Sequence, residues 1–311
     1  MNLHRLRVFR AVAERMSFSA AAEQLYLTQP AVSLQVRALE RSLGVRLFDR
    51  TGGRLALTPA GEALLRSAAT ILNAEDEARR VIDELRGASA GRLIVAANTT
   101  GGMYLVPRLI AAFRAEAPRV QIDLDVDATD RICERVAQGM VDLGFVGGPL
   151  EDRRLAVEPV VDDRLVLIAS PANPLARRGR RRLSLDRLAA EPLIVPEPAS
   201  RTRLLVERRL REAGLPFRPA AQMVGTEAVK KAVEANLGVA FVSSYAVEGE
   251  LALGRLVRVE LDGFAIVRPI VMVHRSERYF TPAALRFREF VRARAQALAG
   301  TPGRRRPRRQ P

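Results

Sequence analysis

Residues 18–61 read FSAAAEQLYLTQPAVSLQVRALERSLGVRLFDRTGGRLALTPAG, and this stretch decides the fold of the N-terminus. Ser17 or Ser19 can cap a short helix over FSAAAEQL, because a side-chain oxygen satisfies a backbone N–H that the first helical turn leaves without a partner. Thr28 can cap the next helix, QPAVSLQVRALERSL, and Pro30 is tolerated in its first turn. Two short helices joined by a tight connection predict a helix-turn-helix.

The later helix of this pair divides into an apolar face and a polar face. The residues expected to pack between the helices are Ala21, Leu25, Leu27, Val32, Val36 and Leu39. That packing leaves Gln29, Ser33 and Arg37 on one outer face, with Pro30 and Leu34 beside them. Glutamine can pair with adenine edges, serine with bases or phosphates, and leucine with a thymine methyl group. The face suits a DNA major groove, although a plain solvated helix face would have the same pattern.

A two-stranded hairpin is expected after this helix. Residues 47–48 begin one strand, a Gly-Gly turn follows, and residues 55–57 return. Arg50 and Arg54 flank the tip, where a wing of this kind can touch phosphates or the minor groove. The alternative is a plain surface hairpin. Residues 1–58 thus read as one winged helix-turn-helix domain.

The series AAA, QPAVS, LE, LG, LF-R and LT-AG within residues 1–60 resembles the N-terminal domain of LysR-type transcriptional regulators. The resemblance extends to about residue 297. It implies a sequence-specific, ligand-responsive regulator that binds double-stranded operator or promoter DNA, with RNA polymerase as a further candidate partner. It also implies that the helix beginning at Gln29 enters the major groove. The residues expected to contact DNA are Thr28, Gln29, Pro30, Ser33, Leu34, Gln35, Arg37, Arg50 and Arg54.

One long helix is expected over residues 59–86. Thr58 can cap it, Pro59 suits its first position, and Gly87 can end it. A heptad seam, interrupted by a glutamate, runs through Leu64, Ala68, Ile71, Glu75, Ala78, Ile82 and Leu85. Such a helix can pair with a second copy of the chain or pack on its own domain. The family resemblance makes residues 59–87 a linker and dimerisation helix, in a homodimer that commonly pairs again into a homotetramer.

Strands alternate with helices from residue 91 to residue 297, which is typical of an α/β fold. Two open sheets joined by two crossings predict two Rossmann-like lobes with a cleft between them. The first lobe would hold residues 91–161 and 266–297, and the second would hold residues 162–265. The family resemblance implies an effector-binding domain similar to the type 2 periplasmic binding proteins.

Ligands in such sheets bind beyond the carboxyl ends of the strands. Thr99 and Thr100 follow the first strand at a helix start, where backbone N–H groups favour anions, although the same threonines can be plain helix caps. Thr226 begins a helix of the second lobe, and Arg201 is a candidate counter-charge. By position and by resemblance, the effector site is expected at Thr99, Thr100, Thr129, Gly147, Ser200, Arg201, Thr202 and Thr226.

We expect the effector to be a small anionic metabolite. The segments NTTGGMYLVP and TEAVKKAVEANLGVAFVS resemble the branch of the family that includes regulators of carbon-fixation operons.

The composition excludes several other kinds of site. Cys133 is the only cysteine, so no internal disulfide and no zinc site built on cysteine pairs can form. Lys230 and Lys231 are the only lysines, so 48 of the 50 basic residues are arginine and the Gly-Lys-Ser/Thr phosphate loop is absent. His4 and His274 lie far apart, and neither has an obvious serine or carboxylate partner. We therefore expect no metal, no cofactor and no enzymatic activity.

Two motifs could be mistaken for catalytic or metal sites. Residues 87–91, GASAG, satisfy the Gly-x-Ser-x-Gly pattern of hydrolases, but a helix precedes them and a strand follows, which reverses the order that this motif needs. Asp123, Asp125 and Asp127 alternate along a strand and are expected to form its solvated face rather than a metal site. Cys133 is expected in a helix core.

The chain carries a net charge of +15, which favours a nucleic-acid partner. Arginines gather in RRGRRR at residues 177–182 and in the tail at residues 300–311, which has nothing to bury and is expected to be disordered. No apolar run reaches the roughly 18 residues of a membrane span. The N-terminus lacks the pattern of a signal peptide, so we expect a cytoplasmic protein without membrane contact.

Two other classes of protein remain as alternatives. A secreted solute-binding protein is opposed by the N-terminal domain and by the missing signal pattern. An α/β enzyme fused to a DNA-binding domain is opposed by the lack of a catalytic constellation.

Overall fold

The structure is a computed structural model that describes residues 2–49, 55–86, 91–176, 183–276 and 279–299. The chain forms two compact units, one built mainly from Met1–Ser89 and one from Ala90–Ala137 and Val141–Pro311. The expected α/β class with a helical, winged N-terminal domain is confirmed. Arg50 and Arg54, residues 87–90, the RRGRRR run and the tail at residues 300–311 lie outside the described residues.

The first unit begins with the expected helix-turn-helix. Its helices are α1 (Leu3–Arg15), α2 (Phe18–Gln24) and α3 (Gln29–Leu43). The side chain of Ser17 accepts a hydrogen bond from the backbone of Ala20, and that of Thr28 accepts one from Ala31, so both predicted caps are confirmed. Gly44, at φ +71°, ends α3 in the left-handed conformation that glycine adopts without strain.

Apolar side chains from these helices make one core. The predicted core residues Ala21, Val32, Val36 and Leu39 are buried, and Leu25 and Leu27 pack partly buried against them. Phe9 of α1 and Phe48 are in contact at the centre, with their ring centroids 5.4 Å apart. Helix α3 is thus held by the core of this unit.

The hairpin and the long helix complete the unit. Strands β1 (Phe48–Asp49) and β2 (Ala56–Leu57) pair antiparallel, as predicted. Helix α4 (Pro59–Leu85) begins at the predicted cap, where the side chain of Thr58 accepts a hydrogen bond from Gly61. A side chain at Gly61 would meet the carbonyl oxygen of Leu47 at 2.1 Å, so glycine is required where α4 crosses the base of the hairpin.

The first half of α4 packs on its own unit, which was the alternative for this helix. Ala68 and Leu72 are fully buried in the core of the unit. Glu75, which interrupts the heptad seam, accepts hydrogen bonds from Arg7 of α1 and from Arg79. The interruption is therefore an ionic anchor of α4 on α1.

The second half of α4 exposes apolar side chains instead of burying them. Ile82 exposes 49% of its surface and Leu85 exposes 72%. The core of the first unit therefore leaves this part of the predicted seam largely uncovered.

The second unit is built on a sheet of seven strands in the order β10-β6-β11-β5-β3-β4, with β9 also paired to β6. The strands are β3 (Arg92–Ala97), β4 (Gln121–Val126), β5 (Leu143–Gly147), β6 (Leu155–Ala169), β9 (Ala240–Ser243), β10 (Val257–Val259) and β11 (Ile266–Arg275). A small parallel sheet holds β7 (Leu193–Pro196) and β8 (Pro219–Met223).

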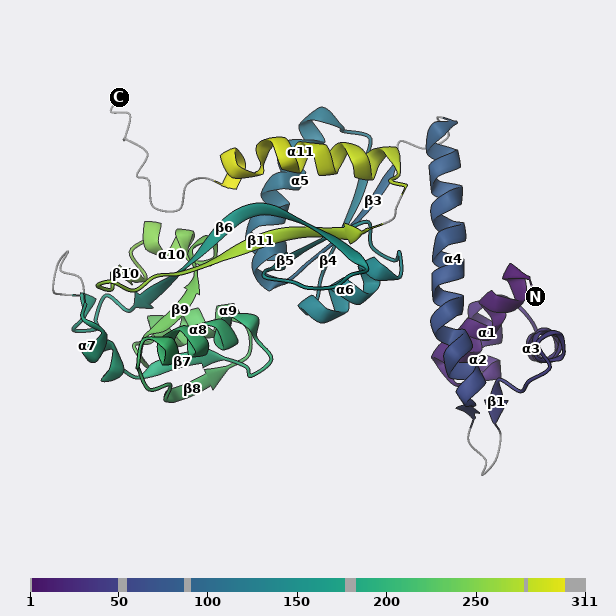
Figure 1. Cartoon of the computed structure of the whole chain (residues 1–311), viewed down its shortest axis with the longest axis horizontal. Helices are drawn as coiled ribbons and strands as arrows, with labels where there is room; N and C mark the ends of the chain where they lie inside the picture. Colours follow the sequence, from purple (N-terminus) through teal and green to yellow (C-terminus); the bar gives the residue numbers. More distant parts are fainter. Residues whose placement is uncertain (1, 50–54, 87–90, 177–182, 277–278, 300–311) are drawn as a thin grey trace. The chain divides into compact units, whose positions relative to one another are not determined.

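Two long strands, β6 and β11, join the two lobes. They pair antiparallel from Leu155 and Arg275 at one end to Leu165 and Ile266 at the other (Figure 1). The two expected crossings are thus β6 and β11, but they belong to one continuous seven-stranded sheet rather than joining two open sheets. The expected lobe boundary after residue 161 falls inside β6, because this strand is part of the sheet in both lobes.

Helices cover both faces of each lobe. In the first lobe, α5 (Val106–Glu116) and α11 (Pro282–Ala299) pack on one face, and α6 (Thr129–Ala137) packs on the other. A short π-helical segment, η2 (Gly101–Leu105), precedes α5.

The second lobe repeats this layering. Helices α7 (Leu185–Ala189) and α8 (Arg201–Glu212) cover one core, and α9 (Thr226–Glu234) and α10 (Glu248–Ala252) cover the other, with a 3-10 turn, η4 (Ser244–Ala246), before α10. Residues at the starts of η2, α6, α8 and α9 line one cavity between the lobes.

Candidate effector cavity and DNA-binding face

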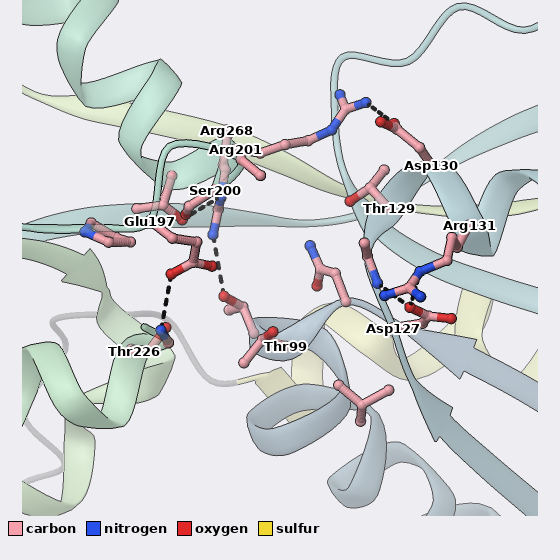
Figure 2. Close-up of a pocket in the computed structure, with 18 residues that line it drawn as sticks. Thr99, Asp127, Thr129, Asp130, Arg131, Glu197, Ser200, Arg201, Thr226 and Arg268 are labelled. Carbon is pink, nitrogen blue, oxygen red and sulfur yellow. Dashed lines mark hydrogen bonds and ion pairs between the residues drawn. The ribbon is translucent and has the colours of Figure 1, made fainter. Parts of the chain in front are cut away.

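A cavity of about 410 Å³ lies between the two lobes of the second unit (Figure 2). It is lined by seven of the eight residues predicted for the effector site: Thr99, Thr100, Thr129, Ser200, Arg201, Thr202 and Thr226. The eighth, Gly147, does not line this cavity but lies behind it, where a side chain would come within 3.6 Å of the Arg268 guanidinium. The positions of these residues in the sequence therefore predicted where the cavity lies. The structure brings the lining residues of the two lobes together.

Arg268 of β11 is the buried charge of this site, and it was not predicted. Only 5% of it is exposed, and its Nη2 lies 2.9 Å from a carboxylate oxygen of Asp163, which is wholly buried. The Ser243 hydroxyl donates to the other oxygen of Asp163 at 2.7 Å. A buried ion pair of this kind needs such additional hydrogen bonds, because neither charge can reach water.

Arg268 also orients two cavity hydroxyls. Its Nη1 donates to the Thr202 hydroxyl at 3.0 Å, and its Nη2 donates to the Thr100 hydroxyl at 3.4 Å. A hydroxyl has one proton to donate and accepts through its lone pairs. Since the oxygens of Thr100 and Thr202 accept from the guanidinium, their protons are left to donate elsewhere. The pair therefore presents donors that suit an anionic or carbonyl oxygen.

One backbone N–H at the start of η2 is already occupied from within the chain, whereas α8 and α9 begin without a hydrogen bond from the side chain of their cap residue. The Asn98 side chain accepts from the backbone N–H of Gly101 at 2.9 Å. In the second lobe, a Glu197 oxygen accepts from the N–H of Gly225 at 2.9 Å, directly before α9. Neither Thr99 nor Thr100 caps η2 with its side chain, so the plain-cap alternative also fails.

Two ion pairs also line the cavity, together with Glu197, which accepts from a backbone N–H. Arg201 lies 2.8 Å from Asp130, and Arg131 lies 2.7 Å from Asp127. The Arg201–Asp130 pair links α8 of one lobe to α6 of the other and is well exposed, so it contributes little to stability. Arg201 can therefore exchange this partner for a bound anion at small cost.

A second cavity of about 490 Å³ adjoins this region. It shares Asp130, Ala199, Arg201 and Arg268 with the first cavity and is otherwise lined by Gly147, Gly148, Pro149, Leu204, Leu205 and Arg208. Arg201 and Arg268 thus line both cavities. Gly147, which was predicted for the effector site, lines the second cavity.

The candidate DNA-binding face lies on α3 of the first unit. Thr28, Gln29, Pro30 and Arg37 are exposed, and Leu34 exposes 58% of its surface. Gln35 is half-buried, and Ser33 is 8% exposed.

The side chains of Gln29 and Ser33 interact directly. The Gln29 amide donates to the Ser33 hydroxyl at 3.1 Å. Ser33 is therefore less open to a DNA base than its helical spacing predicted, and Gln29 is the side chain that it orients.

Glu40 anchors the hairpin to α3, and sequence reasoning missed it. Its Oε1 accepts from the backbone N–H of Leu47 at 2.8 Å and from that of Phe48 at 3.4 Å. The carboxylate occupies two donors that the short strand would otherwise leave open. It therefore sets where the hairpin leaves α3.

The structure corrects the expectation that His274 has no carboxylate partner. Its Nε2 lies 3.1 Å from Glu158, and Arg288 and Arg292 of α11 pair with the same carboxylate. Burial alone would raise the pKa of Glu158, but hydrogen bonds from Arg288 and His274 outweigh it and hold this pKa below its usual value. The cluster joins β6, β11 and α11, and no nucleophile contacts it among the described residues.

The other residues that could suggest a catalytic or metal site do not have the geometry for either. Cys133 is buried in α6 as predicted, and burial raises the pKa of its thiol. Asp123, Asp125 and Asp127 pair with arginines at 2.7, 2.5 and 2.7 Å, on a largely solvent-facing strand edge. Within the described ranges, no three His, Cys, Asp or Glu side chains form a group that could hold a metal ion.

Helices long and apolar enough to cross a membrane are absent from the described part of the chain.

Comparisons with known proteins agree with the division of the chain into two units. Residues 3–62 match the family model of the bacterial regulatory helix-turn-helix protein, lysR family, and residues 86–296 match the LysR substrate binding domain. The RuBisCO operon transcriptional regulator of Allochromatium vinosum is 39% identical over 298 residues, which cover 96% of this chain and 98% of that protein.

Solved structures are similar as well. Full-length CbnR complexed with its target DNA superposes with a TM-score of 0.71 at 25% identity, covering 94% of this chain and 99% of that one. The regulatory domain of CcmR from Synechocystis PCC6803, in complex with 2-PG, gives a TM-score of 0.59 at 27% identity, over 65% of this chain and 96% of that one.

Proposed function

The chain belongs to the LysR-type transcriptional regulators, and we propose that a small anionic metabolite, bound in the cavity between its two lobes, controls its binding to DNA. The observation that carries this proposal is the Arg268 network. A buried guanidinium that orients the hydroxyls of Thr100 and Thr202 creates donors preorganised for an anionic oxygen. Arg201, with its exposed partner, supplies the second positive group.

The anion would meet side-chain donors as well as the start of α9, which no cap side chain occupies. Asn98 already occupies the first backbone N–H of η2, and Glu197 accepts from Gly225, the residue before α9. The hydroxyls of Thr99, Thr129, Ser200 and Thr226 complete the lining. An effector held by both lobes would stabilise one of their relative orientations.

DNA would be bound by the exposed end of α3, with Gln29, Pro30, Leu34 and Arg37 at the major groove and Ser33 orienting Gln29. Gln35 and Thr28 lie beside them, and Arg50 and Arg54 would reach the phosphates or the minor groove from the hairpin. Glu40 fixes the base of this hairpin on α3. The relative CbnR was solved in complex with its target DNA, which supports DNA binding by the same fold here.

The exposed second half of α4 suits pairing with another chain. Ile82 and Leu85 expose apolar surface on a helix that the first unit covers only up to its middle. We propose a homodimer through this segment and further association into a tetramer. Its compartment would be the cytoplasm, where bacterial DNA lies.

Target genes and effector class can be proposed from the relatives. The Allochromatium vinosum relative is named a RuBisCO operon regulator, and the CcmR domain was solved with 2-PG. We propose that this chain likewise regulates carbon-fixation genes and that a compact anion of that kind is its effector. The cavity of about 410 Å³ is large enough for a small metabolite.

Footprinting across the DNA upstream of the protein's own gene tests the proposed function. We expect a protected stretch with defined ends in the presence of excess random DNA. A thermal-shift screen with organic acids and phosphates then identifies the effector, and each hit is checked for chemical change. Protection no better than on random DNA would contradict the regulator, and chemical conversion of the hit would point to the enzyme alternative.

A further inference from the structure

Lys230 is buried in a chain that otherwise uses arginine for nearly all its positive charge. Only 3% of it is exposed, and it lies on α9, one turn after the start of this helix at the cavity. Its neighbour Lys231 is 59% exposed and pairs with Glu234 of the same helix. Lysine presents a compact ammonium, whereas arginine needs room for a planar fork. The surroundings of Lys230 indicate why the smaller group stands here.

The ammonium of Lys230 joins three acceptors of the second lobe. Its Nζ lies 2.7 Å from Glu227, 2.8 Å from Glu250 of α10 and 2.7 Å from the carbonyl oxygen of Ala246. These acceptors use all three protons of the ammonium. The charge is therefore satisfied, and Glu227 is held in one position.

Glu227 reaches across to the first lobe. The hydroxyl of Tyr104, in η2, donates to a Glu227 oxygen, and the Lys230 ammonium lies 5.4 Å from the centre of the Tyr104 ring, within the range of a cation–π contact. Burial and the Glu227 carboxylate raise the pKa of Tyr104, so this hydroxyl keeps its proton and remains a donor. Tyr104, Glu227, Lys230 and Glu250 therefore form one connected cluster, which we name the interlobe latch.

The latch adjoins the effector cavity on both sides. Thr100 lines the cavity directly before η2, and Thr226 lines it at the first position of α9. Tyr104 and Glu227 follow these threonines on the same two segments. Arg108 and Glu248 make a second, exposed pair between α5 and the start of α10, with their atoms 2.6 Å apart.

We propose that Lys230 and Tyr104 are positioning residues that hold the two lobes in the orientation in which the cavity residues meet. This inference rests on the proposed function, because it gives the latch the task of preorganising the effector site. A protein whose binding-competent arrangement is only partly populated binds its ligand more weakly by that fraction. The latch thus raises effector affinity without touching the effector.

The test measures lobe orientation in the full-length chain without any ligand. Spin labels are placed at two exposed alanines, one in each lobe, with Ala115→Cys and Ala213→Cys in a Cys133→Ser background. The labelled chain is diluted with unlabelled protein, so that distances between chains do not contribute. Pulsed electron resonance then gives the distribution of distances between the lobes.

Four proteins are compared: the parent, Tyr104→Phe, Lys230→Gln and the matched control Lys231→Gln. We expect one narrow distribution in the parent and in Lys231→Gln, and a broadened or shifted one in the two latch variants. Tyr104→Phe removes only the hydroxyl donor, so it keeps the inference testable if Lys230→Gln does not fold. A melting temperature of Tyr104→Phe close to that of the parent would separate positioning from general stability.

Identical distributions in the parent and Tyr104→Phe would overturn the latch, and so would an equal change in Lys231→Gln. Operator footprints of the same proteins keep this result apart from the proposed function. An unchanged distribution together with a normal footprint rejects only the latch, whereas the absence of a footprint in the parent rejects the regulator.

In the second readout, the best-stabilising anion from the screen is titrated by calorimetry. We expect its dissociation constant to rise by about threefold to tenfold in Tyr104→Phe, because the binding-competent arrangement becomes less populated by roughly that factor. An unchanged constant would also contradict the latch.

Discussion

Arg268→Met should destabilise the second unit strongly, because it leaves Asp163 buried without its counter-charge. Arg268 is 5% exposed and Asp163 is fully buried, so water cannot replace the lost partner. Breaking a buried pair from one side costs about 3–5 kcal/mol. For a unit of this size each kcal/mol lowers the melting temperature by about 2–4 °C, so we expect a drop of roughly 10 °C.

Circular dichroism melts of the full chain measure this drop, and two further variants interpret it. Asp163→Asn with Arg268→Met removes the stranded charge while keeping an acceptor for Ser243, so this double variant should recover a large part of the loss. Arg258→Met removes a more exposed arginine that pairs with Glu260, and should cost less than about 1 kcal/mol. A melting temperature of Arg268→Met within about 2 °C of the parent would refute the claim that this pair organises the site.

Three further predictions concern DNA binding, assembly and pH. Gln29→Ala should weaken operator binding by about 1–3 kcal/mol in a filter-binding titration, and an equal loss on random DNA would speak against base recognition. Ile82→Asp should convert dimers to monomers in sedimentation runs, because it places a charge in an apolar seam, and an unchanged dimer would remove α4 from the interface. The folded pKa of Glu158 lies below its usual value of 4.5, so its ionised form stabilises the fold above that pH and the benefit is lost as the pH falls through the folded pKa. The melting temperature should therefore fall less between about pH 5 and about pH 3 in Glu158→Gln than in the parent, and equal falls would contradict the shift.

The helices and caps of the first unit could be predicted well, because their signals are local. Ser17, Thr28 and Thr58 cap helices through hydrogen bonds that span three residues. The Gly-Gly turn likewise indicated the hairpin from neighbouring residues. Such short-range patterns depend little on the rest of the fold.

Long-range pairing explains most of what the sequence did not predict. Arg268 stands in the apolar run IVRPIVMV, and that charge in a central strand was a usable signal for a buried site. Its partner Asp163 lies 105 residues away, and Glu158 lies 116 residues from His274, so neither pair shows a spacing that can be recognised.

The cavity proposed as the effector site shows the same limit. Strand ends and threonines located the cavity correctly, because the carboxyl ends of strands meet at one edge of a sheet. Asn98 nevertheless occupies the first N–H of η2, which was expected to be free, through a bond that spans three residues. Glu197 binds the N–H of Gly225 from 28 residues away, and only three-dimensional proximity reveals that contact. On α4, periodicity predicted one continuous seam, but its first half turned out to serve the core of its own unit.

The most direct test of the account is the change in operator affinity that the effector causes, compared between the parent and two cavity variants, Thr100→Val and Thr226→Val. The account predicts a change of about 5- to 150-fold in the parent, its loss in both variants, and unchanged operator binding by all three proteins without effector. A full effector response in both variants would contradict the assigned site, and loss of DNA binding without effector would mean that these threonines are structural.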